Sequence, residues 1–370
     1  MRVTRLQARQ FRRFDDVQIE PGPGLNLITG DNGAGKTSLL EALHLMAYGR
    51  SFRARVRDGL IRDGQSALEV FVEWEERHLP NATNAPAETR RRRAGLRHAG
   101  SDWSGRLDGR DVEQLGDLCA ALAVVTFEPG SHALITGSAE YRRRYLDWGL
   151  FHVEHDFLVA WRRYARALKQ RNALLKRRGN AAELDVWERE MADAGERVTR
   201  HRETYLAELQ PHVASLLEVW APALGHVELG YQPGWRRETV PLADALLLSR
   251  DRDLQAGYTS AGPHRADWRI DFSGIPGRAA LSRGQAKIAA LAAILGQGEH
   301  QAGQRGQWPV VALDDLASEL DRAHQGRVLD RLAGWGAQVF MTGTDTPPGL
   351  VDRGLEPVVF HVEHGVPRAA

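Results

Sequence analysis

The chain has 370 residues and a net charge of +1, from 49 basic and 48 acidic side chains. Its 42% hydrophobic and 26% charged residues are ordinary for a soluble protein of two or three domains, which excludes a disordered chain, a collagen or a coiled-coil rod. The single cysteine excludes a disulfide framework and a zinc site of paired thiolates. No uncharged apolar run reaches the roughly 18 residues of a membrane span, and the N-terminus lacks a signal peptide pattern. We therefore expect a cytoplasmic protein without a membrane partner.

The N-terminal part predicts strands around one glycine-rich turn. Apolar alternation indicates strands within residues 1–19, and 25–29 is a short apolar strand. Residues 37–48 carry an apolar face at helical spacing. A further strand is expected at 66–74, whereas the polar, arginine-containing segment 80–101 is predicted to be a solvated loop or hairpin tip.

The middle of the chain is helical and polar. Residues 139–215 contain few glycines, and Gly179-Asn180 divides them into two long helices, an αα-hairpin. Residues 139–178 hold eleven basic and four acidic side chains, and 179–208 hold four basic and eight acidic ones. Two interpretations stay open, because the helices can neutralise one another or the basic helix can face a polyanion.

The glycine-rich turn fits the phosphate-binding pattern G-x-x-x-x-G-K-[ST] and lies between a strand and a helix. Its backbone N–H groups and the helix N-terminus favour phosphate oxygens. Lys36, one of only four lysines in the chain, would reach the β- and γ-phosphates, and Thr37 would bind Mg²⁺. The predicted ATP-binding residues are Gly30, Asp31, Asn32, Gly33, Ala34, Gly35, Lys36 and Thr37.

A second apolar strand, 310–313, ends in Asp314-Asp315. Strands often end in an aspartate before a turn, so the pattern is weak alone. In a P-loop ATPase, however, the first carboxylate holds Mg²⁺ and the next one orients or deprotonates the attacking water. With the P-loop present, Asp314 is a predicted Mg²⁺ ligand together with Thr37.

Residues 281–285, Leu-Ser-Arg-Gly-Gln, precede an alanine-rich helix. The serine is a natural helix N-cap. The segment also lies shortly before the strand of Asp314, as an ABC-type signature does, and Glu-Leu-Asp at 319–321 follows at the spacing of a D-loop. This order separates ABC-type ATPases from kinases and small GTPases.

These motifs together resemble the RecF family of bacterial recombination and repair ATPases, which are SMC-like ABC proteins without the long coiled coil. The resemblance covers nearly the whole chain. It rests on residues 10–14, 30–37, 49–53, 141–148, 168–172, 259–265, 282–285 and 314–321.

The resemblance implies an α/β fold, an ABC/SMC-type P-loop ATPase head with an inserted α-helical hairpin domain. The head is expected at 1–130 and 250–370, with a β-rich lobe over about 1–110, and the helical insertion at 131–249.

The resemblance also implies roles for individual residues. Asp315 takes the position of the catalytic carboxylate, beside Lys36 and Asp314. Ser282, with Gly284 and Gln285, would contact the γ-phosphate of ATP held by a second subunit, so that ATP joins a head-to-tail homodimer. Arg12 is expected to help hold the nucleotide, unless it is a solvated surface arginine.

For function, the resemblance implies ATP-dependent binding to double-stranded DNA at single-strand gaps during replication, recombination and the SOS response to DNA damage. There the protein would help RecR and RecO load RecA. Phosphate neutralisation by a basic face gives affinity without base readout. The candidate contacts are Arg142, Arg143, Arg144, Arg162, Arg163, Arg166, Lys169 and Arg171.

The sequence departs from the wider ABC pattern in ways that bear on hydrolysis. Asp315 replaces the usual glutamate, and no histidine follows the strand 338–341. The chain has no convincing Q-loop glutamine, and Phe-Glu-Pro at 127–129 is a candidate substitute. We expect slow, DNA-stimulated hydrolysis, with ATP acting mainly as a switch. The alternatives are a structural SMC-like clamp without useful hydrolysis and a transporter-type ABC subunit. The long, charged hairpin and the missing Q-loop and switch histidine disfavour the transporter.

Overall fold

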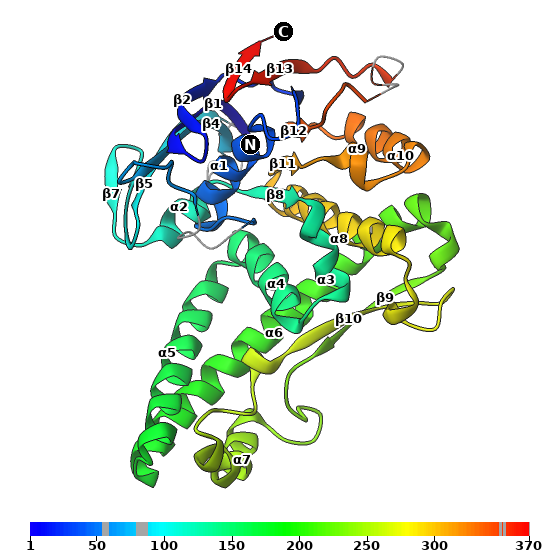
Figure 1. Ribbon diagram of the computed structural model, residues 1–370. Coiled ribbons are helices and arrows are strands. Elements are labelled where there is room, and N and C mark those ends of the chain that lie inside the picture. The colour runs from blue at the N-terminus through cyan, green and yellow to red at the C-terminus, as the bar shows by residue number, and fades with distance from the viewer. Residues whose placement is uncertain (54–58, 79–87, 348–349, 351–352, 370) are drawn as a thin grey trace. The chain divides into compact units, whose positions relative to one another are not determined.

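The computed structural model describes residues 1–53, 59–78, 88–347, 350 and 353–369. The chain forms two compact units, Met1–Ser131 with Leu291–Ala370, and His132–Ala290; their elements are labelled in Figure 1. The division falls inside helix α8, Arg283–Arg305. Residues 250–290, which the sequence assigned to the head, therefore belong to the second unit.

The first unit contains an antiparallel sheet in the order β2-β1-β4-β5-β6-β7. Residues 88–99 form one of its strands, whereas the sequence predicted a solvated loop or hairpin tip over 80–101. Residues 79–87 lie outside the described part. The strand forms because Arg91 lies opposite Glu75 and Arg93 opposite Glu73, so the charge run becomes a cross-strand ladder. The strands are β1 Arg2–Phe11, β2 Phe14–Ile19, β4 Leu68–His78, β5 Glu88–Ala99, β6 Asp102–Leu107 and β7 Arg110–Val112.

The second sheet of this unit has the order β14-β13-β3-β12-β11-β8. Strands β3, β12, β11 and β8 are parallel neighbours, so their carboxyl ends meet at one edge. The predicted strands at 25–29, 310–313 and 338–341 are confirmed, the last beginning one residue later. The strands are β3 Leu25–Thr29, β8 Val124–Phe127, β11 Val310–Leu313, β12 Val339–Thr342, β13 Val358–Glu363 and β14 Val366–Ala369.

Helix α1, Lys36–Tyr48, links the two sheets of the first unit. It contacts β1 and β4 of the antiparallel sheet and β8 and β12 of the parallel one. Its residues from Ser38 to Ala47 are all buried, which is why the segment is apolar on more than one face. One continuous core therefore holds both sheets against the helix that follows the P-loop. The other helices here are α2 Leu115–Ala121, α9 Leu316–Glu319 and α10 Arg322–Ala333.

The second unit is mainly helical and contains the predicted αα-hairpin, which is confirmed. Arg178 ends the first arm in a left-handed conformation with φ 54°, and Asn180 caps the second by accepting a hydrogen bond of 2.8 Å from the Glu183 amide. The first arm is two helices rather than one, because Glu154 caps a new helix there. The elements are α3 Ala133–Thr136, α4 Ala139–Val153, α5 His155–Arg177, α6 Ala181–Trp220, β9 Val227–Gln232, α7 Leu242–Ala256 and β10 Asp267–Phe272.

Opposite charges meet inside this hairpin. The fully buried Arg171 of α5 donates to Glu188 of α6 at 3.0 Å and to Asp253 of α7 at 2.8 Å. Arg163 of α5 donates to Glu190 of α6 at 2.8 Å. The interpretation that the two helices neutralise one another is therefore correct for Arg163 and Arg171. A buried arginine with two carboxylates fixes the helices against one another, because leaving any one of these charges unpaired costs several kcal/mol.

No helix among the described residues is both long and apolar enough to cross a membrane.

The buried His44 of α1 makes the stability of the first unit pH-dependent. Its Nδ1 lies 2.9 Å from the Thr126 hydroxyl and its ring stacks on Tyr48. Burial, assisted by the positive charge of Arg50, lowers its pKa from 6.5 to about 3. Between these values the unfolded chain binds a proton that the folded chain excludes, so stability falls as the pH drops from 6.5 toward 3.

We expect the free energy of unfolding to fall by about 1 kcal/mol more in the wild type than in His44→Gln between pH 7 and pH 5.5. Urea titration of both proteins at the two pH values measures this difference. Other titrating groups act equally on both proteins, so an identical loss in the two would contradict the assignment to His44.

Candidate functional site

The turn between β3 and α1 is shaped by glycines with positive φ. Gly33 and Gly35 have φ of 81° and 118°, values that side-chain-bearing residues rarely adopt. A Cβ on Gly35 would also lie 2.8 Å from the Phe14 ring. The first turn of α1 carries no acidic side chain. The turn therefore presents a helix N-terminus suited to an anion.

Lys36 lies with its side chain folded over this turn. Its ammonium donates to the carbonyl oxygens of Gly30 at 2.6 Å and Asp31 at 2.9 Å. The side chain is buried. A compact ammonium, rather than a branched guanidinium, fits between these two carbonyls.

Asp314 directly follows β11 and joins the turn to the strand ends of the parallel sheet. Its Oδ1 accepts hydrogen bonds from the Thr37 hydroxyl at 2.9 Å and from the Thr342 hydroxyl at 2.8 Å. Asp314 is only 3% exposed. Burial raises the pKa of this carboxyl, and the hydrogen bonds from Thr342 and Thr37 oppose that rise. The structure thus brings together the two side chains predicted to bind Mg²⁺.

Thr342 was absent from the predicted site. Its hydroxyl donates to Asp314 and accepts a hydrogen bond of 2.8 Å from the Asp315 amide. Asp315 itself is partly buried and has a left-handed backbone with φ 53°. Thr342 therefore orients both carboxylate residues. The sequence offered one signal for Thr342, its position at the end of a predicted parallel strand. Such strand ends meet at one edge of the sheet.

Arg12 is bound to the helix that follows the turn. Its guanidinium donates through two nitrogens to the carboxylate of Glu41, at 2.7 and 2.9 Å, and to the Gly59 carbonyl at 3.0 Å. Glu41 is fully buried and also accepts from the Ser51 hydroxyl. Arg12 is thus not merely a solvated surface arginine, because it anchors the turn after β1 to α1.

The signature-like segment belongs to the second unit and lies on its surface. Ser282 Oγ accepts from the Gln285 amide at 3.2 Å, and the Ser282 amide donates to Gln285 Oε1 at 2.9 Å. These reciprocal bonds form a capping box at the start of α8. Ser282 and Gly284 are exposed, and a Cβ built on Gly284 meets nothing within 4 Å.

The predicted DNA contacts separate into two groups. Arg142 is 2% exposed and donates through two nitrogens to Asp267, and Arg171 is fully buried, so these two belong to the interior of the unit and not to a DNA-binding surface. Arg143 donates to the Ala266 carbonyl at 2.7 Å. The remaining ion-paired residues are Arg144, bound to Glu140, and Arg163, bound to Glu190 and Asp193.

Arg162, Arg166 and Lys169 are exposed. They lie at positions i, i+4 and i+7 of α5, which is one face of a helix. Lys176 continues the same face and is also exposed. We call these four residues the α5 stripe. Within the described part of the chain, none of them forms an ion pair.

Comparison with known proteins identifies the family that shares this sequence and fold. Residues 2–347 match the family described as the RecF/RecN/SMC N-terminal domain. The chain is 64% identical over 365 residues to the DNA replication and repair protein RecF of Stenotrophomonas maltophilia (strain R551-3), covering 98% of each. A RecF of Thioalkalivibrio sulfidiphilus is 37% identical over 368 residues, covering 100% of this chain and 99% of that protein.

Solved structures agree with the sequence comparison. The fold matches the recombination mediator protein RecF with ATP, of the RecFOR pathway, with a TM-score of 0.87 and 25% identity over 100% of this chain and 97% of that one. An Smc head domain from Pyrococcus furiosus, at 15% identity and a TM-score of 0.57 over 100% and 96%, shares the fold alone. The ATPase-head fold expected from the sequence is confirmed, and the chain belongs to the RecF family.

Proposed function

We propose that this chain is an ATP-dependent DNA-binding protein of replication and recombinational repair. It dimerises on double-stranded DNA at single-strand gaps, hydrolyses ATP slowly, and helps RecR and RecO load RecA. The observation that carries the proposal is the contact of Thr37 with Asp314 at the edge of the parallel sheet, in a chain of the RecF family. The RecF relatives named for replication and repair, and the one solved with ATP, support it.

The turn at residues 30–37 binds the triphosphate of ATP. Its N–H groups and the N-terminus of α1 face the phosphates, and Lys36 moves from the loop carbonyls to the β- and γ-phosphate oxygens. The hydroxyl of Thr37 and the carboxylate of Asp314 are oxygen donors of the kind that Mg²⁺ prefers. When bound, Mg²⁺ supplies charge neutralisation for the phosphates.

Hydrolysis depends on the carboxylate that follows. Asp315 orients the attacking water, and its backbone is fixed by the hydrogen bond to Thr342. An aspartate is one methylene shorter than the usual glutamate, so the water is held less closely and turnover is slow. ATP then stays bound and unhydrolysed long enough to hold a dimer together.

The dimer forms when the signature segment of one subunit meets ATP bound to another. The exposure of Ser282 and Gly284 supports this role, as does the open space around Gly284. The N-terminus of α8 begins at this segment and carries no acidic residue in its first turn. A hydroxyl and exposed backbone N–H groups there suit the γ-phosphate oxygens.

Duplex DNA binds to the α5 stripe. Arg162, Arg166, Lys169 and Lys176 present cations on one helix face. None of them forms an ion pair with another described residue, so phosphates do not have to break one, although Arg166 also acts electrostatically on Glu190. The neighbouring Arg163 and Arg171 are engaged in ion pairs and position the helix. Such a face contacts the DNA backbone and gives salt-dependent, sequence-independent affinity.

The dimer can be tested by separating ATP binding from association. We expect Ser282→Arg to keep ATP affinity within a few-fold while losing the ATP-dependent dimer, because the added side chain blocks the surface of the signature. Lys36→Met should lose both properties. Light scattering with and without ATP-Mg²⁺, together with fluorescent ATP titration, measures them. A Ser282→Arg protein that dimerises normally with ATP would refute the assignment.

Thr342 can be tested with an isosteric change. We expect Thr342→Val to slow single-turnover hydrolysis at least tenfold, because Asp314 and Asp315 both lose a hydrogen-bond partner. The pKa of Asp314 should rise further, since the Thr342 bond lowers it. The Mg²⁺ concentration for half-maximal ATP binding should then increase, and more so at lower pH. The control is Thr344→Val, an exposed threonine of the same loop; equal effects of the two changes would contradict the role.

DNA binding at the α5 stripe predicts a specific salt dependence of the affinity for duplex. Changing Arg162, Arg166 and Lys169 together to Gln should make the slope of log K against log salt for duplex binding shallower by roughly 3, if each residue contacts one phosphate. A matched control changes three other exposed arginines of the unit, Arg189, Arg200 and Arg236, to Gln. Anisotropy titrations with a labelled duplex at several salt concentrations measure both slopes. The same slope for both triple variants would exclude the α5 stripe as the duplex site.

A further inference from the structure

Two turns from other parts of the first unit donate hydrogen bonds to carbonyl groups of the P-loop, residues 30–37. The first is the turn between β1 and β2, where the Arg13 guanidinium donates to the Gly33 carbonyl at 3.0 Å. The second is the turn between β13 and β14, where the Gly365 amide donates to the Ala34 carbonyl at 3.1 Å. Two successive carbonyls of the P-loop are therefore held by donors that are not part of it.

These bonds determine where the N–H groups of the same peptide units point. A trans peptide unit is planar, so its N–H points away from its C=O. The bond to the Ala34 carbonyl therefore directs the amide of Gly35 to the opposite side. The bond to the Gly33 carbonyl fixes the plane of the Ala34 amide, which itself donates to the Asp31 carbonyl at 3.1 Å. Turning either unit over would point a carbonyl oxygen, instead of an N–H donor, at a bound phosphate.

The hairpin of β13 and β14 is fixed against the strand that leads into the P-loop. Strand β13 is parallel to β3, with His361 opposite Thr29. The Nδ1 atom of His361 lies 3.1 Å from the Thr29 hydroxyl. A Cβ on Gly30 would lie only 2.2 Å from the Val362 carbonyl oxygen. Strand β13 therefore packs tightly beside the start of the P-loop, and the turn that follows β13 reaches the Ala34 carbonyl.

The turn between β13 and β14 has two residues, because Glu363 pairs with Val366. Both of them, His364 and Gly365, have positive φ, of 48° and 81°. Such values are those of a type I′ turn, which favours glycine at its second position. The nearest atom to a Cβ on Gly365 would be the Arg13 carbonyl oxygen, at the ordinary contact distance of 3.6 Å. The backbone conformation, and not a lack of space, therefore requires glycine here.

Arg13 differs from its neighbour Arg12 in what its guanidinium holds. Arg12 is bound to the buried carboxylate of Glu41, so its removal leaves a buried charge without its partner. Arg13 is exposed, and its guanidinium donates to a backbone carbonyl. Replacing Arg13 therefore uncovers no buried charge, and we expect the effect to fall on the P-loop rather than on the stability of the unit.

We propose that Arg13 and the β13–β14 turn are positioning elements of the nucleotide site, which hold the P-loop in its phosphate-binding form before ATP arrives. They act through the peptide groups of the P-loop and not by contact with the phosphates. A loop that is already ordered in its binding form loses less conformational entropy when the ligand binds, so the affinity is higher. The inference rests on the ATP binding proposed above, and it adds that two turns outside the P-loop help set the affinity for ATP.

The first test replaces Arg13. We expect Arg13→Met to weaken ATP binding about tenfold in a fluorescent ATP titration with Mg²⁺, roughly the contribution of one hydrogen bond to a charged group. Arg13→Lys should recover most of the affinity, because an ammonium can also donate to the Gly33 carbonyl. Single-turnover hydrolysis at saturating ATP should stay within twofold of the wild type, since the ground state and the transition state both lose the same contact.

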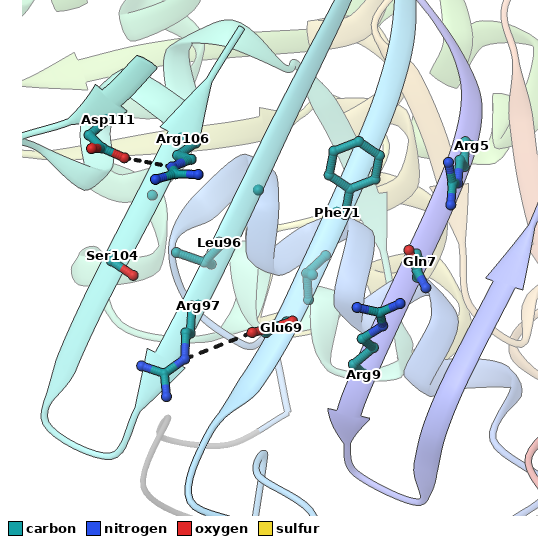
Figure 2. Close-up of a pocket in the computed structure, with 13 residues that line it drawn as sticks. Arg5, Gln7, Arg9, Glu69, Phe71, Leu96, Arg97, Ser104, Arg106 and Asp111 are labelled. Atoms are coloured by element: carbon teal, nitrogen blue, oxygen red, sulfur yellow. Dashed lines mark hydrogen bonds and ion pairs between the residues drawn. The ribbon is translucent and has the colours of Figure 1, made fainter. Parts of the chain in front are cut away.

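The control for this series is Arg9→Met. Arg9 is an exposed arginine of β1 that lines a hollow of about 660 Å³ on the face formed by β1, β4, β5 and β6 (Figure 2). Its guanidinium donates to Asp16 at 3.0 Å and not to the P-loop. Arg9→Met removes the same charge from the same hairpin as Arg13→Met, and we expect it to leave the affinity for ATP unchanged.

The second test changes the turn without changing any charge. Asparagine tolerates a positive φ, whereas the β-branched valine does not. We expect Gly365→Val to shift the turn and weaken ATP binding about tenfold, and Gly365→Asn to stay within twofold of the wild type. Thermal melts without nucleotide establish that each variant is folded. If Gly365→Val does not fold, the Arg13 series decides the question.

The outcomes separate this inference from the proposed function. A wild type that does not bind ATP overturns both. A wild type that binds ATP, with folded Arg13→Met and Gly365→Val that bind it equally well, overturns the positioning role alone. The same holds if Arg9→Met loses as much affinity as Arg13→Met, or if Arg13→Met slows hydrolysis at saturating ATP without any loss of affinity. Weaker binding that Arg13→Lys restores supports the role.

Discussion

One buried carboxylate, that of Asp314, connects the parts of the candidate site. A carboxylate with 3% exposure is costly to desolvate, and here two hydroxyls offset that cost. One hydroxyl begins the P-loop helix and the other ends a neighbouring strand. The order β3-β12-β11 is what makes this possible, because it brings three strand ends to one edge. A shift of any of these strands would break a hydrogen bond to a buried charge.

The second unit depends on charges in a different way. Arg142, Arg171 and Arg202 are each nearly fully buried and each bound to carboxylates from other elements. Such pairs add little net stability relative to apolar packing, but removing one partner is costly. They therefore determine which helices pack together and which of their residues lie opposite one another. Some basic residues of the first hairpin arm form these buried ion pairs, and others form the exposed α5 stripe. Counts of basic and acidic residues alone do not distinguish the two groups.

The sequence predicted those features that depend on local chain geometry. The P-loop, the strand of Asp314 and the turn at Gly179-Asn180 follow from glycine, apolar runs and capping residues, and the structure places them as expected. Strand β5 was missed because its arginines look solvated until Glu73 and Glu75 of β4 lie opposite them. Arg142 and Arg171 were misread for the same reason, since their partners Asp267 and Asp253 are far away in sequence. Thr342 was missed because only the sheet order brings it to Asp314.

Glycines show how a structure adds information that the sequence lacks. Gly35 has two structural reasons to be glycine, a φ of 118° and the nearby Phe14 ring. Gly284 has neither: its backbone conformation is ordinary, and an added Cβ would meet nothing within 4 Å. It also carries a cost, since glycine weakens a helix. A glycine that its own fold does not require is explained when another molecule must approach there. Gly284 lies on an exposed surface, where ATP of a second subunit is proposed to bind.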